Sequence, residues 1–571
     1  MRIKLLHFND LHGHIVSFTS RFSMTATPRQ MEAATQPELS LQAVWCANAN
    51  NRLRPRLQSD YAPIFSRVAA WLHAVRTRYA DDPRVAMLAA SAGDESGGDI
   101  FDLLLGRDPE SYQLHAGYRL CSQAGVDLGV IGNHDLDRGD RLLAHAIGQD
   151  ARFPVLSANV TGSPALAACC YPAAIFVTRG VRIGFIGLTT PAQVRPEPGS
   201  PRRVADPVAT ALHLIPALRP LCDVLVILSH LGYSLAAHSA TVRGAGDVEL
   251  ARSLPAGAVH LIVGGHTHNA LNENGLSAAN VINGIPIVQA GKLGQFAGEV
   301  DIGVQQTAAV THARLRAAID LPVDETFERE HVRPAAAAVQ PYREQLLGQT
   351  ADDDDLRADA VANAFAAGES ALANFITDAL VRQARERGLP VDLAMIDASG
   401  VSDGLPVGAA LSLGDWFALM PYADTLCLYR LTGRQLGALL QDNAYRLDRP
   451  GQPHVEAGFL HFSGQVRYAI EAGAAPGQAR AVDVRVDNQP IEELLDRTFL
   501  VAASSFLREL AASWEAHARR DASLSLFDLQ SLPAQQTAVY VRDLLVEYII
   551  AHGGVLPEGG ARRDGRLRVL N

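Results

Sequence analysis

The segment Ile3-Lys4-Leu5-Leu6-His7-Phe8-Asn9-Asp10-Leu11-His12 lies at the start of the chain and decides the fold. Its first six residues are mostly apolar and show no regular polar alternation, which predicts a strand buried on both faces. Asp10 and His12 follow at the end of this strand, where the loops of α/β sheets carry chemistry. One Asp and one His are weak evidence alone, but four later segments share the same layout.

Each of these four segments is a short apolar run followed by side chains that can bind a metal ion. The runs and their polar residues are Val85–Ala90 with Asp94, Val126–Ile131 with Asn133, His134 and Asp137, Val224–Leu228 with His230, and Leu261–Val263 with His266 and His268. Five strand ends therefore offer a cluster of carboxylate, amide and imidazole donors without a cysteine. This donor set suits Mn²⁺, Zn²⁺, Fe or Co rather than a structural thiolate zinc site.

The composition describes an ordinary globular protein of more than one domain. A chain of 571 residues is too long for a single core, and 48% hydrophobic with 19% charged residues is typical of globular proteins. The net charge of −11 argues against binding of a nucleic-acid polymer. Small phosphorylated substrates are compatible with this charge, because bound cations reverse the charge of an acidic pocket locally.

The first residues show no basic region followed by an apolar core, and no apolar run reaches the roughly 18–20 residues that span a bilayer. We therefore expect a cytoplasmic protein without a membrane partner, or an exported one if Met1 is not the true start. The cysteines lack a framework spacing, which predicts free thiols in a reducing compartment. They are Cys46, Cys121, Cys169, Cys170, Cys222 and Cys427.

Residues 17–62 contain several prolines and little periodicity, so we interpret them as an insertion. Residues 63–79 and 207–218 have helical spacing, and a hairpin is expected around Arg179-Gly180. Periodicity alone favours a plain doubly wound sheet for this half of the chain.

Further along, an Ala-rich stretch and Asp352-Asp353-Asp354-Asp355 predict a helical and acidic linker over 331–360. Beyond it we expect helices over 369–385 and 535–550, strands over 391–396, 458–470, 480–486 and 498–504, and a capping box that joins Thr432 to Gln435.

The metal-binding motifs occur in an order that resembles the calcineurin-like metallophosphoesterases, and among them the two-domain 5′-nucleotidase family. The resemblance is strong over residues 1–320 and looser beyond. It implies an α/β chain with a four-layer α/β/β/α metallophosphoesterase sandwich over 1–330, the linker 331–360, and a C-terminal α+β substrate domain over 361–571. The motifs are Asn9-Asp10-Leu11-His12, Gly93-Asp94, Gly132-Asn133-His134-Asp135-Leu136-Asp137, Ser229-His230-Leu231-Gly232 and Gly265-His266-Thr267-His268.

The resemblance also implies two divalent metal ions. Asp10, His12 and His268 resemble the ligands of one ion, Asn133, His230 and His266 those of the second, and Asp94 the bridge between them. Any one of these could instead be a capping or core polar residue, but seven in this order make that interpretation remote.

His134 should point into the cleft rather than at a metal ion, where it can stabilise charge on the phosphoryl group. Asp137 can accept from its other ring nitrogen and hold the tautomer. The alternative is a surface histidine beside a helix start. We interpret Asp135 as structural.

The substrate-binding motifs of the family are altered. Ser402 occupies the position of an arginine, and Tyr422 and Asp424 stand for a stacking Phe and an Asn. Ser505-Phe506-Leu507 lacks the Gly-Gly-Asp that should follow. Tyr422 and Phe506 can still hold a nucleobase by stacking, although core packing explains them nearly as well.

We therefore expect a dimetal phosphoester hydrolase in which metal-bound hydroxide attacks a phosphomonoester such as a nucleotide. A phosphodiesterase acting on a cyclic nucleotide or nucleotide-sugar, or a sulfur-ester hydrolase, would use the same scaffold. An alternative of another class is a binding protein with a vestigial metal site. The sequence leaves open the metal identity, the physiological substrate and the oligomeric state.

Overall fold

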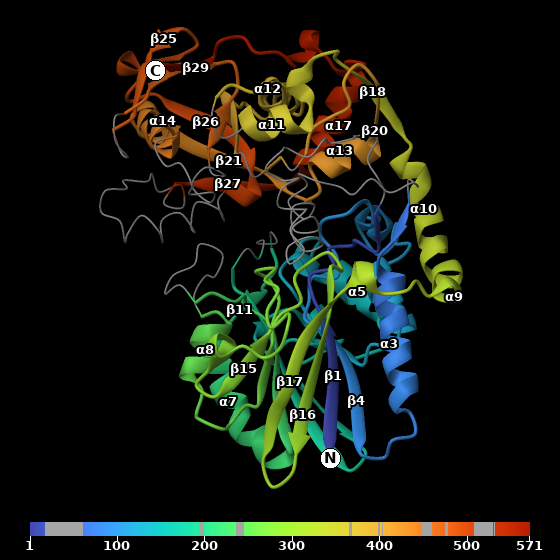
Figure 1. Cartoon of the computed structure of the whole chain (residues 1–571). Coiled ribbons are helices and arrows are strands. Elements are labelled where there is room, and N and C mark those ends of the chain that lie inside the picture. Colours follow the sequence, from blue (N-terminus) through green and yellow to red (C-terminus); the bar gives the residue numbers. More distant parts are fainter. Residues whose placement is uncertain are drawn as a thin grey trace. The chain divides into compact units, whose positions relative to one another are not determined.

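The structure, a computed structural model, divides the chain into two compact units with a boundary between Pro341 and Tyr342 (Figure 1). Most of the predicted insertion lies outside the described residues. Its two ends form a short antiparallel pair, β2 (Val16–Ser17) with β3 (Ala62–Pro63). Among the described helices, none is long and apolar enough to cross a bilayer. The described residues are 1–17, 61–192, 194, 199–235, 245–364, 368–397, 400–401, 403–447, 459–473, 478–507, 529 and 532–570.

The N-terminal unit contains a seven-stranded sheet in which the opening segment of the chain is an inner strand. The strand order is β17-β16-β1-β4-β5-β6-β8. β1 runs parallel to β4, with Phe8 opposite Ser91, and antiparallel to β16. The strands are β1 (Arg2–Phe8), β4 (Val85–Ser91), β5 (Leu128–Val130), β6 (Val155–Leu156), β8 (Cys170–Tyr171), β16 (Phe296–Val304) and β17 (Ala308–Ala317).

A six-stranded sheet carries the second half of the unit, in the order β14-β15-β13-β12-β10-β9. The expected hairpin around Arg179-Gly180 joins β9 to β10. The central strands β10, β12, β13 and β15 run parallel. The strands are β9 (Ala173–Thr178), β10 (Val181–Thr189), β12 (Val224–His230), β13 (Leu261–Val263), β14 (Val281–Ile282) and β15 (Ile285–Val288).

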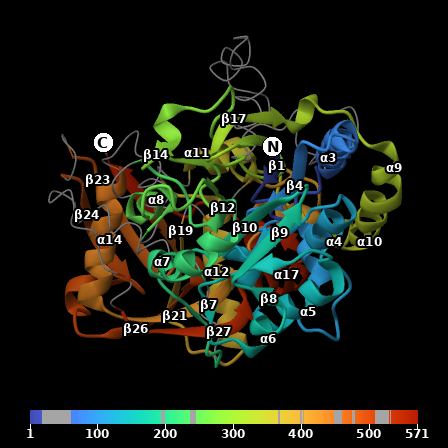
Figure 2. The ribbon, with the colours of Figure 1, turned by 90° about the horizontal axis from the view of Figure 1, so that it is seen from below.

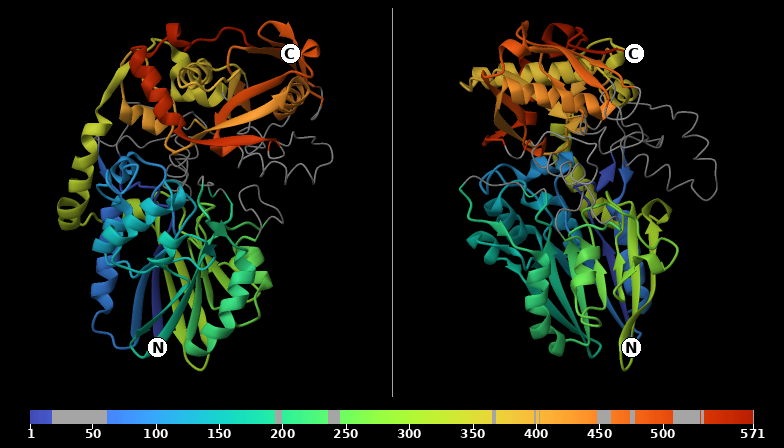
Figure 3. Two further views of the ribbon diagram at one scale, coloured as in Figure 1. Left: turned by 180° about the vertical axis from the view of Figure 1, so that it is seen from behind. Right: turned by 90° about the vertical axis from the view of Figure 1, so that its left-hand side faces the viewer.

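The two sheets pack face to face and helices cover their outer faces. Ile3 and Leu5 join residues of both sheets in one core, whereas Ile227 and Ile287 face a second core shared with α7 and α8. Figures 1 and 2 show α3 beside β4 and α7 and α8 beside the six-stranded sheet, and Figure 3 (right) shows the sheets as separate layers. The helices are α3 (Phe65–Tyr79), α4 (Ala116–Gln123), α5 (Asp140–Asp150), α6 (Pro164–Ala167), α7 (Pro207–Leu218), α8 (Asp247–Ser253), α9 (Glu325–Phe327) and α10 (Arg333–Arg343).

This four-layer sandwich confirms the fold implied by the family resemblance. The plain doubly wound sheet favoured by periodicity is wrong. The reason is that strands covered on both faces read as continuous apolar runs in either architecture, so the pattern cannot distinguish one sheet from two.

The C-terminal unit is built on a five-stranded sheet in the order β22-β19-β26-β21-β27, with two smaller sheets beside it. Along β19, Ala394 and Ile396 face one core and Leu393 and Met395 the other. The strands are β18 (Leu346–Thr350), β19 (Leu393–Asp397), β20 (Ala410–Ser412), β21 (Thr425–Thr432), β22 (Leu460–Phe462), β23 (Val466–Glu471), β24 (Arg480–Val486), β25 (Gln489–Pro490), β26 (Thr498–Ser504), β27 (Ala534–Tyr540), β28 (Gly554–Val555) and β29 (Leu567–Leu570).

Helices α12 and α17 pack on one face of this sheet and α14 on the other. The expected capping box is present: the Gln435 N–H donates to Thr432 Oγ1 at 3.3 Å, and the Thr432 N–H donates to Gln435 Oε1 at 2.8 Å. The helices are α11 (Ala358–Ala364), α12 (Ala371–Glu386), α13 (Leu413–Leu419), α14 (Gly433–Leu447) and α17 (Val541–Ala551).

The helix predicted over 535–550 is wrong in its first part. Residues 534–540 form β27, which pairs antiparallel with β21, and only Val541–Ala551 is helical. The β-branched side chains of Thr537 and Val539 suit an edge strand, and a sheet partner distant in sequence outweighs local helical spacing. Within the predicted linker, residues 346–350 form β18 of the C-terminal unit.

Candidate metal centre

The predicted ligands lie at the ends of five strands of the N-terminal unit: His230 is the last residue of β12, and the others lie in the loops that follow β1, β4, β5 and β13. β1, β4 and β5 are parallel in one sheet, and β12 and β13 are parallel in the other, so each group ends at one edge of its sheet. The loops also bond to one another. The Asp10 N–H donates to Gly93 O at 2.9 Å, and the His266 N–H donates to Asp10 Oδ2 at 3.0 Å. The ligand-bearing loops of both sheets therefore form one site.

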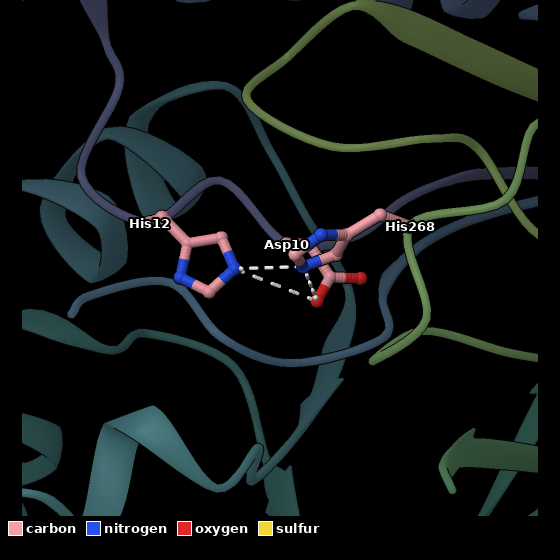
Figure 4. Close-up of side chains that lie close together, drawn as sticks. All are labelled: Asp10, His12 and His268. Carbon is pink, nitrogen blue, oxygen red and sulfur yellow. Dashed lines mark hydrogen bonds and ion pairs between the residues drawn. The ribbon is translucent and has the colours of Figure 1, made fainter. Parts of the chain in front are cut away.

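Asp10, His12 and His268 make the first cluster, shown in Figure 4. His268 Nε2 lies 3.2 Å from Asp10 Oδ1 and 3.1 Å from His12 Nε2. The distance from His12 Nε2 to Asp10 Oδ1 is 3.7 Å. These are the three residues that the family resemblance groups around one ion.

Asp94 lies between this cluster and a second group, which consists of Asn133, His230 and His266. Its Oδ2 atom is 3.0 Å from His230 Nε2 and 3.9 Å from His12 Nε2. Asn133 Oδ1 is 2.9 Å from His266 Nδ1. Asp94 therefore faces one histidine of each predicted ligand set, and its role as the bridge stays a prediction. Asp10 also reaches the second group, with 3.9 Å between its Oδ1 and His230 Nε2, which the sequence did not indicate.

The orientation of the imidazole rings fits a divalent cation. His12 Nδ1 is 2.9 Å from Gly97 O, and His230 Nδ1 is 2.6 Å from Ala92 O. A carbonyl only accepts, so these contacts place a proton on Nδ1 and leave Nε2 toward the carboxylates. A backbone carbonyl behind a histidine is the usual support of a metal-binding imidazole.

The site is buried and rich in charge. Burial raises the pKa of Asp94, but the nearby His230 and His134 imidazoles outweigh it and hold the pKa well below its usual range. Burial also raises the pKa of Asp10, and His268 and His230 lower it to about 2. Burial lowers the pKa of His230, yet Asp94 and Asp10 raise it to about 10. Two buried carboxylates require a compensating positive charge, from a protonated imidazole or from a bound cation.

Left-handed backbone conformations concentrate at this site. A residue with a side chain rarely adopts a positive φ, and such conformations gather where function requires a fixed geometry. Five of the seven predicted ligands have one: Asp10 (φ 53°), His12 (49°), Asp94 (57°), His266 (75°) and His268 (59°).

His134 and Asp137 lie beside the cluster: His134 begins a single 3₁₀ turn and Asp137 directly follows it. His134 Nδ1 is 2.8 Å from Asp137 Oδ2, and the His134 N–H donates to Asp94 Oδ1 at 2.9 Å. The side chain of Asp137 is 3% exposed and that of His134 is 16% exposed, so the imidazole lies at the edge of the buried cluster.

Asp135, interpreted as structural, ties two ligand-bearing loops together. Its carboxylate accepts the N–H groups of Asp94 at 3.1 Å, Glu95 at 3.1 Å and Gly132 at 2.9 Å. The acidic residue in the motif was visible in the sequence, but its partners depend on the approach of two loops that only the fold reveals.

The predicted substrate residues lie in the C-terminal unit. Tyr422 precedes β21 and is 37% exposed, and half-buried Phe506 follows β26. Leu426 pairs with Ser504, so both residues lie at the same end of this strand pair. Ser402 is outside the described residues.

Comparison with known proteins agrees with this architecture. A family model described as "5'-nucleotidase, C-terminal domain" matches residues 347–518. The trifunctional nucleotide phosphoesterase protein YfkN of Bacillus subtilis is 23% identical over 73% of this chain and 29% of its own length. Protein UshA of Yersinia enterocolitica is 28% identical over 60% of this chain and 66% of its own length. The aligned parts thus cover less than two thirds of both relatives.

A solved structure shows the same fold along the whole chain. The 5'-nucleotidase precursor from Thermus thermophilus is 23% identical, covers 100% of both chains and has a TM-score of 0.60. The clusters described above offer ligands for a metal ion. Residues 347–518 thus match the C-terminal domain of 5'-nucleotidases, and the whole chain shares the fold of a solved 5'-nucleotidase precursor.

Proposed function

We propose that this chain is a metal-dependent phosphoester hydrolase of the 5′-nucleotidase type, acting on a small phosphomonoester such as a nucleotide. The observation that carries the proposal is the convergence of Asp10, His12, Asp94, His230 and His268 on one buried site, with the His134 imidazole beside it. The nucleotide phosphoesterase and 5'-nucleotidase names of the relatives support a nucleotide as substrate.

We assign two divalent ions to the site, held as the family resemblance implies. Asp10, His12 and His268 would hold one ion, and Asn133, His230 and His266 the other, with Asp94 shared. Such a pair lowers the pKa of a bound water and neutralises charge on the phosphoryl oxygens. The oxygen and imidazole donors suit Mn²⁺, Zn²⁺, Co²⁺ or Fe.

His134 supplies the hydrogen bond that the reaction needs beside the metal ions. Asp137 accepts from Nδ1, which fixes the ring and directs Nε2 away from the carboxylate. An Nε2–H can then donate to the phosphoryl group or to the ester oxygen that leaves, where negative charge grows.

We place substrate recognition partly in the C-terminal unit. Tyr422 and Phe506 leave the same end of the strand pair formed by β21 and β26. Stacking of a base on an aromatic ring contributes about 1–3 kcal/mol, so two rings suffice to select a nucleoside over a simple phosphate ester.

The test is a substrate panel on the purified full-length protein. Metal-stripped protein is reloaded separately with Mn²⁺, Zn²⁺, Co²⁺ and Fe²⁺, and unloaded protein is the control. The panel contains nucleoside 5′-monophosphates, an aryl phosphate, a cyclic nucleotide, a nucleotide-sugar and a sulfur ester. We expect metal-dependent phosphate release, fastest from a nucleoside monophosphate.

Other outcomes identify the alternatives. Preference for the cyclic nucleotide or nucleotide-sugar indicates a phosphodiesterase, and preference for the sulfur ester indicates a sulfur-ester hydrolase. Failure to bind any of the four metals in stoichiometric amount would favour a binding protein with a vestigial site.

A further inference from the structure

A buried glutamine holds the loop that carries His266 and His268. Gln289 is 0% exposed and directly follows β15, which lies beside β13. Its Nε2 donates to Gly265 O, and its Oε1 accepts from Thr267 Oγ1 at 3.2 Å and from the Asn269 N–H at 2.5 Å. One side chain therefore contacts Gly265, Thr267 and Asn269, which lie on either side of each histidine in the sequence.

The orientation of this carboxamide follows from its partners. A backbone N–H only donates and a carbonyl only accepts, so Oε1 faces Asn269 and Nε2 faces Gly265. No apolar side chain of similar size can replace these three bonds. Each donor and acceptor of the buried carboxamide has a hydrogen-bond partner, and this matters because a buried polar group without a partner destabilises the folded state.

The loop requires such support because its backbone is strained. His266 and His268 both have left-handed φ values, 75° and 59°. Residues other than glycine keep this conformation only where the surroundings impose it. Gln289 bonds the residue before His266, the residue between the histidines and the residue after His268.

The same network extends to the loop after His230. Thr267 Oγ1 accepts the Tyr233 N–H at 2.8 Å, and Asn269 Nδ2 donates to Tyr233 O at 3.1 Å. Gln289 thus joins the strand β15 to the loops at the ends of both β13 and β12. The loop after β13 and the end of β12 carry three of the seven assigned ligands, His266, His268 and His230.

We propose that Gln289 is a positioning residue of the metal centre, which holds His266 and His268 in the geometry that binds both ions. The inference rests on the two-metal assignment made under the proposed function. That assignment gives His266 to one ion and His268 to the other. Loss of the Gln289 hydrogen bonds should therefore weaken the binding of both ions.

The experiment compares Co²⁺ binding by full-length wild-type protein and Gln289→Met, which keeps the length of the side chain and removes its hydrogen bonds. Metal-stripped protein is titrated with Co²⁺, and both stoichiometry and the visible d–d spectrum are recorded. Loss of a group that supports a metal ligand typically weakens binding about 10–100-fold. We expect a loss in this range for both ions and a changed spectrum.

The matched control is Asn443→Leu in the C-terminal unit. Asn443 is also 0% exposed, and its carboxamide also makes three bonds, to Leu460 O at 2.8 Å, Tyr468 Oη at 2.8 Å and the Leu460 N–H at 2.7 Å. This variant should lose stability to a similar degree and keep wild-type Co²⁺ affinity and spectrum.

Wild-type affinity and spectrum in Gln289→Met would overturn the proposal. If that variant does not fold, Thr267→Val decides, because it removes only the hydroxyl that donates to Gln289 and accepts from Tyr233 and Asn269. A changed spectrum supports the proposal and an unchanged one overturns it. Wild-type protein that binds no Co²⁺ would instead refute the proposed function, and with it this role of Gln289.

Discussion

His134 Nδ1 and Asp137 Oδ2 lie 2.8 Å apart across a single 3₁₀ turn, in which Asp137 directly follows the last residue of the turn. The spacing of three residues brings the two side chains together, as the sequence predicts. Because the N–H of His134 also donates to Asp94, one residue links the hydrogen-bonding imidazole to the carboxylate assigned as the bridge.

Replacing His134 by Asn should separate chemistry from metal binding. We expect His134→Asn to keep the metal content of wild type and to lower kcat about 10²–10³-fold, the range for losing one hydrogen-bond donor to the transition state. Steady-state kinetics and elemental analysis on the same preparation check this. Metal content that falls in step with activity would make His134 a ligand.

Replacing Asp94 by Asn, in contrast, should weaken metal binding itself. The Asp94 side chain is 1% exposed, and its Oδ2 faces His230 Nε2 at 3.0 Å. An amide of the same shape removes the charge that two cations require, so metal affinity should fall by more than the about 10–100-fold typical of a supporting residue. Calorimetric titration with Mn²⁺ measures the loss. Retained stoichiometric binding would contradict the bridging assignment.

Gly265 lies where a side chain has no room. A Cβ added there would lie 2.7 Å from Ala92 O, 2.8 Å from His230 Nδ1 and 3.0 Å from Asp10 Oδ2. Gly265→Ala should therefore displace the ligand loops and reduce both metal content and thermal stability, as measured by elemental analysis and the unfolding midpoint.

The matched control for Gly265→Ala is Gly148→Ala. Gly148 lies in α5, and an added Cβ there meets nothing within 4 Å. Alanine in a helix interior is favoured over glycine by about 0.5–1 kcal/mol, so this variant should keep its metal and gain stability slightly. Equal effects of the two substitutions would mean that close packing at Gly265 does not matter.

The sequence could predict which residues come together at the candidate site, because the end of a strand can be recognised where polar residues follow an apolar run. Asp10, Asp94, Asn133, His230 and His266 each follow an apolar run, and parallel strands bring such positions to one edge. The number of sheets could not be predicted from the sequence. Strands such as β1 and β12 are covered on both faces, and a strand of this kind has the same apolar pattern whether the protein has one sheet or two.

Gln289 shows a second limit of sequence reasoning. It is one polar residue after an apolar strand, with no motif and no partner nearby in sequence. Its three contacts lie 20–24 residues earlier, in a loop that only the β13–β15 pairing places opposite it. The helix predicted to begin at residue 535 was wrong for a similar reason: residues 534–540 form a strand because they pair with β21, which is distant in sequence.

The last prediction concerns acid stability and a histidine outside the metal centre. His115 caps α4: its Nδ1 accepts the Tyr118 N–H at 3.1 Å, and the ring stacks on Tyr118 with centroids 4.0 Å apart. An imidazole that accepts at Nδ1 is neutral with its proton on Nε2. Burial lowers the pKa of His115 from 6.5 to about 4, so the folded state resists protonation.

The sign of the effect follows from this lowered pKa. Between pH 6.5 and pH 4 the unfolded chain binds a proton at residue 115 that the folded protein does not, so stability is present above pH 6.5 and is lost as the pH falls. From pH 7.5 to pH 5 the loss of unfolding free energy attributable to this residue is about 2 kcal/mol.

His115→Asn keeps an N-cap acceptor and removes the titrating group. Urea unfolding with a chelator present, at pH 7.5 and pH 5, should show that the variant loses about 2 kcal/mol less than wild type between the two pH values. Other titrating groups, His7 among them, are common to both proteins and cancel in this difference. Parallel pH dependence of the two proteins would show that His115 accepts its proton in the folded state, and that its burial does not contribute to acid lability.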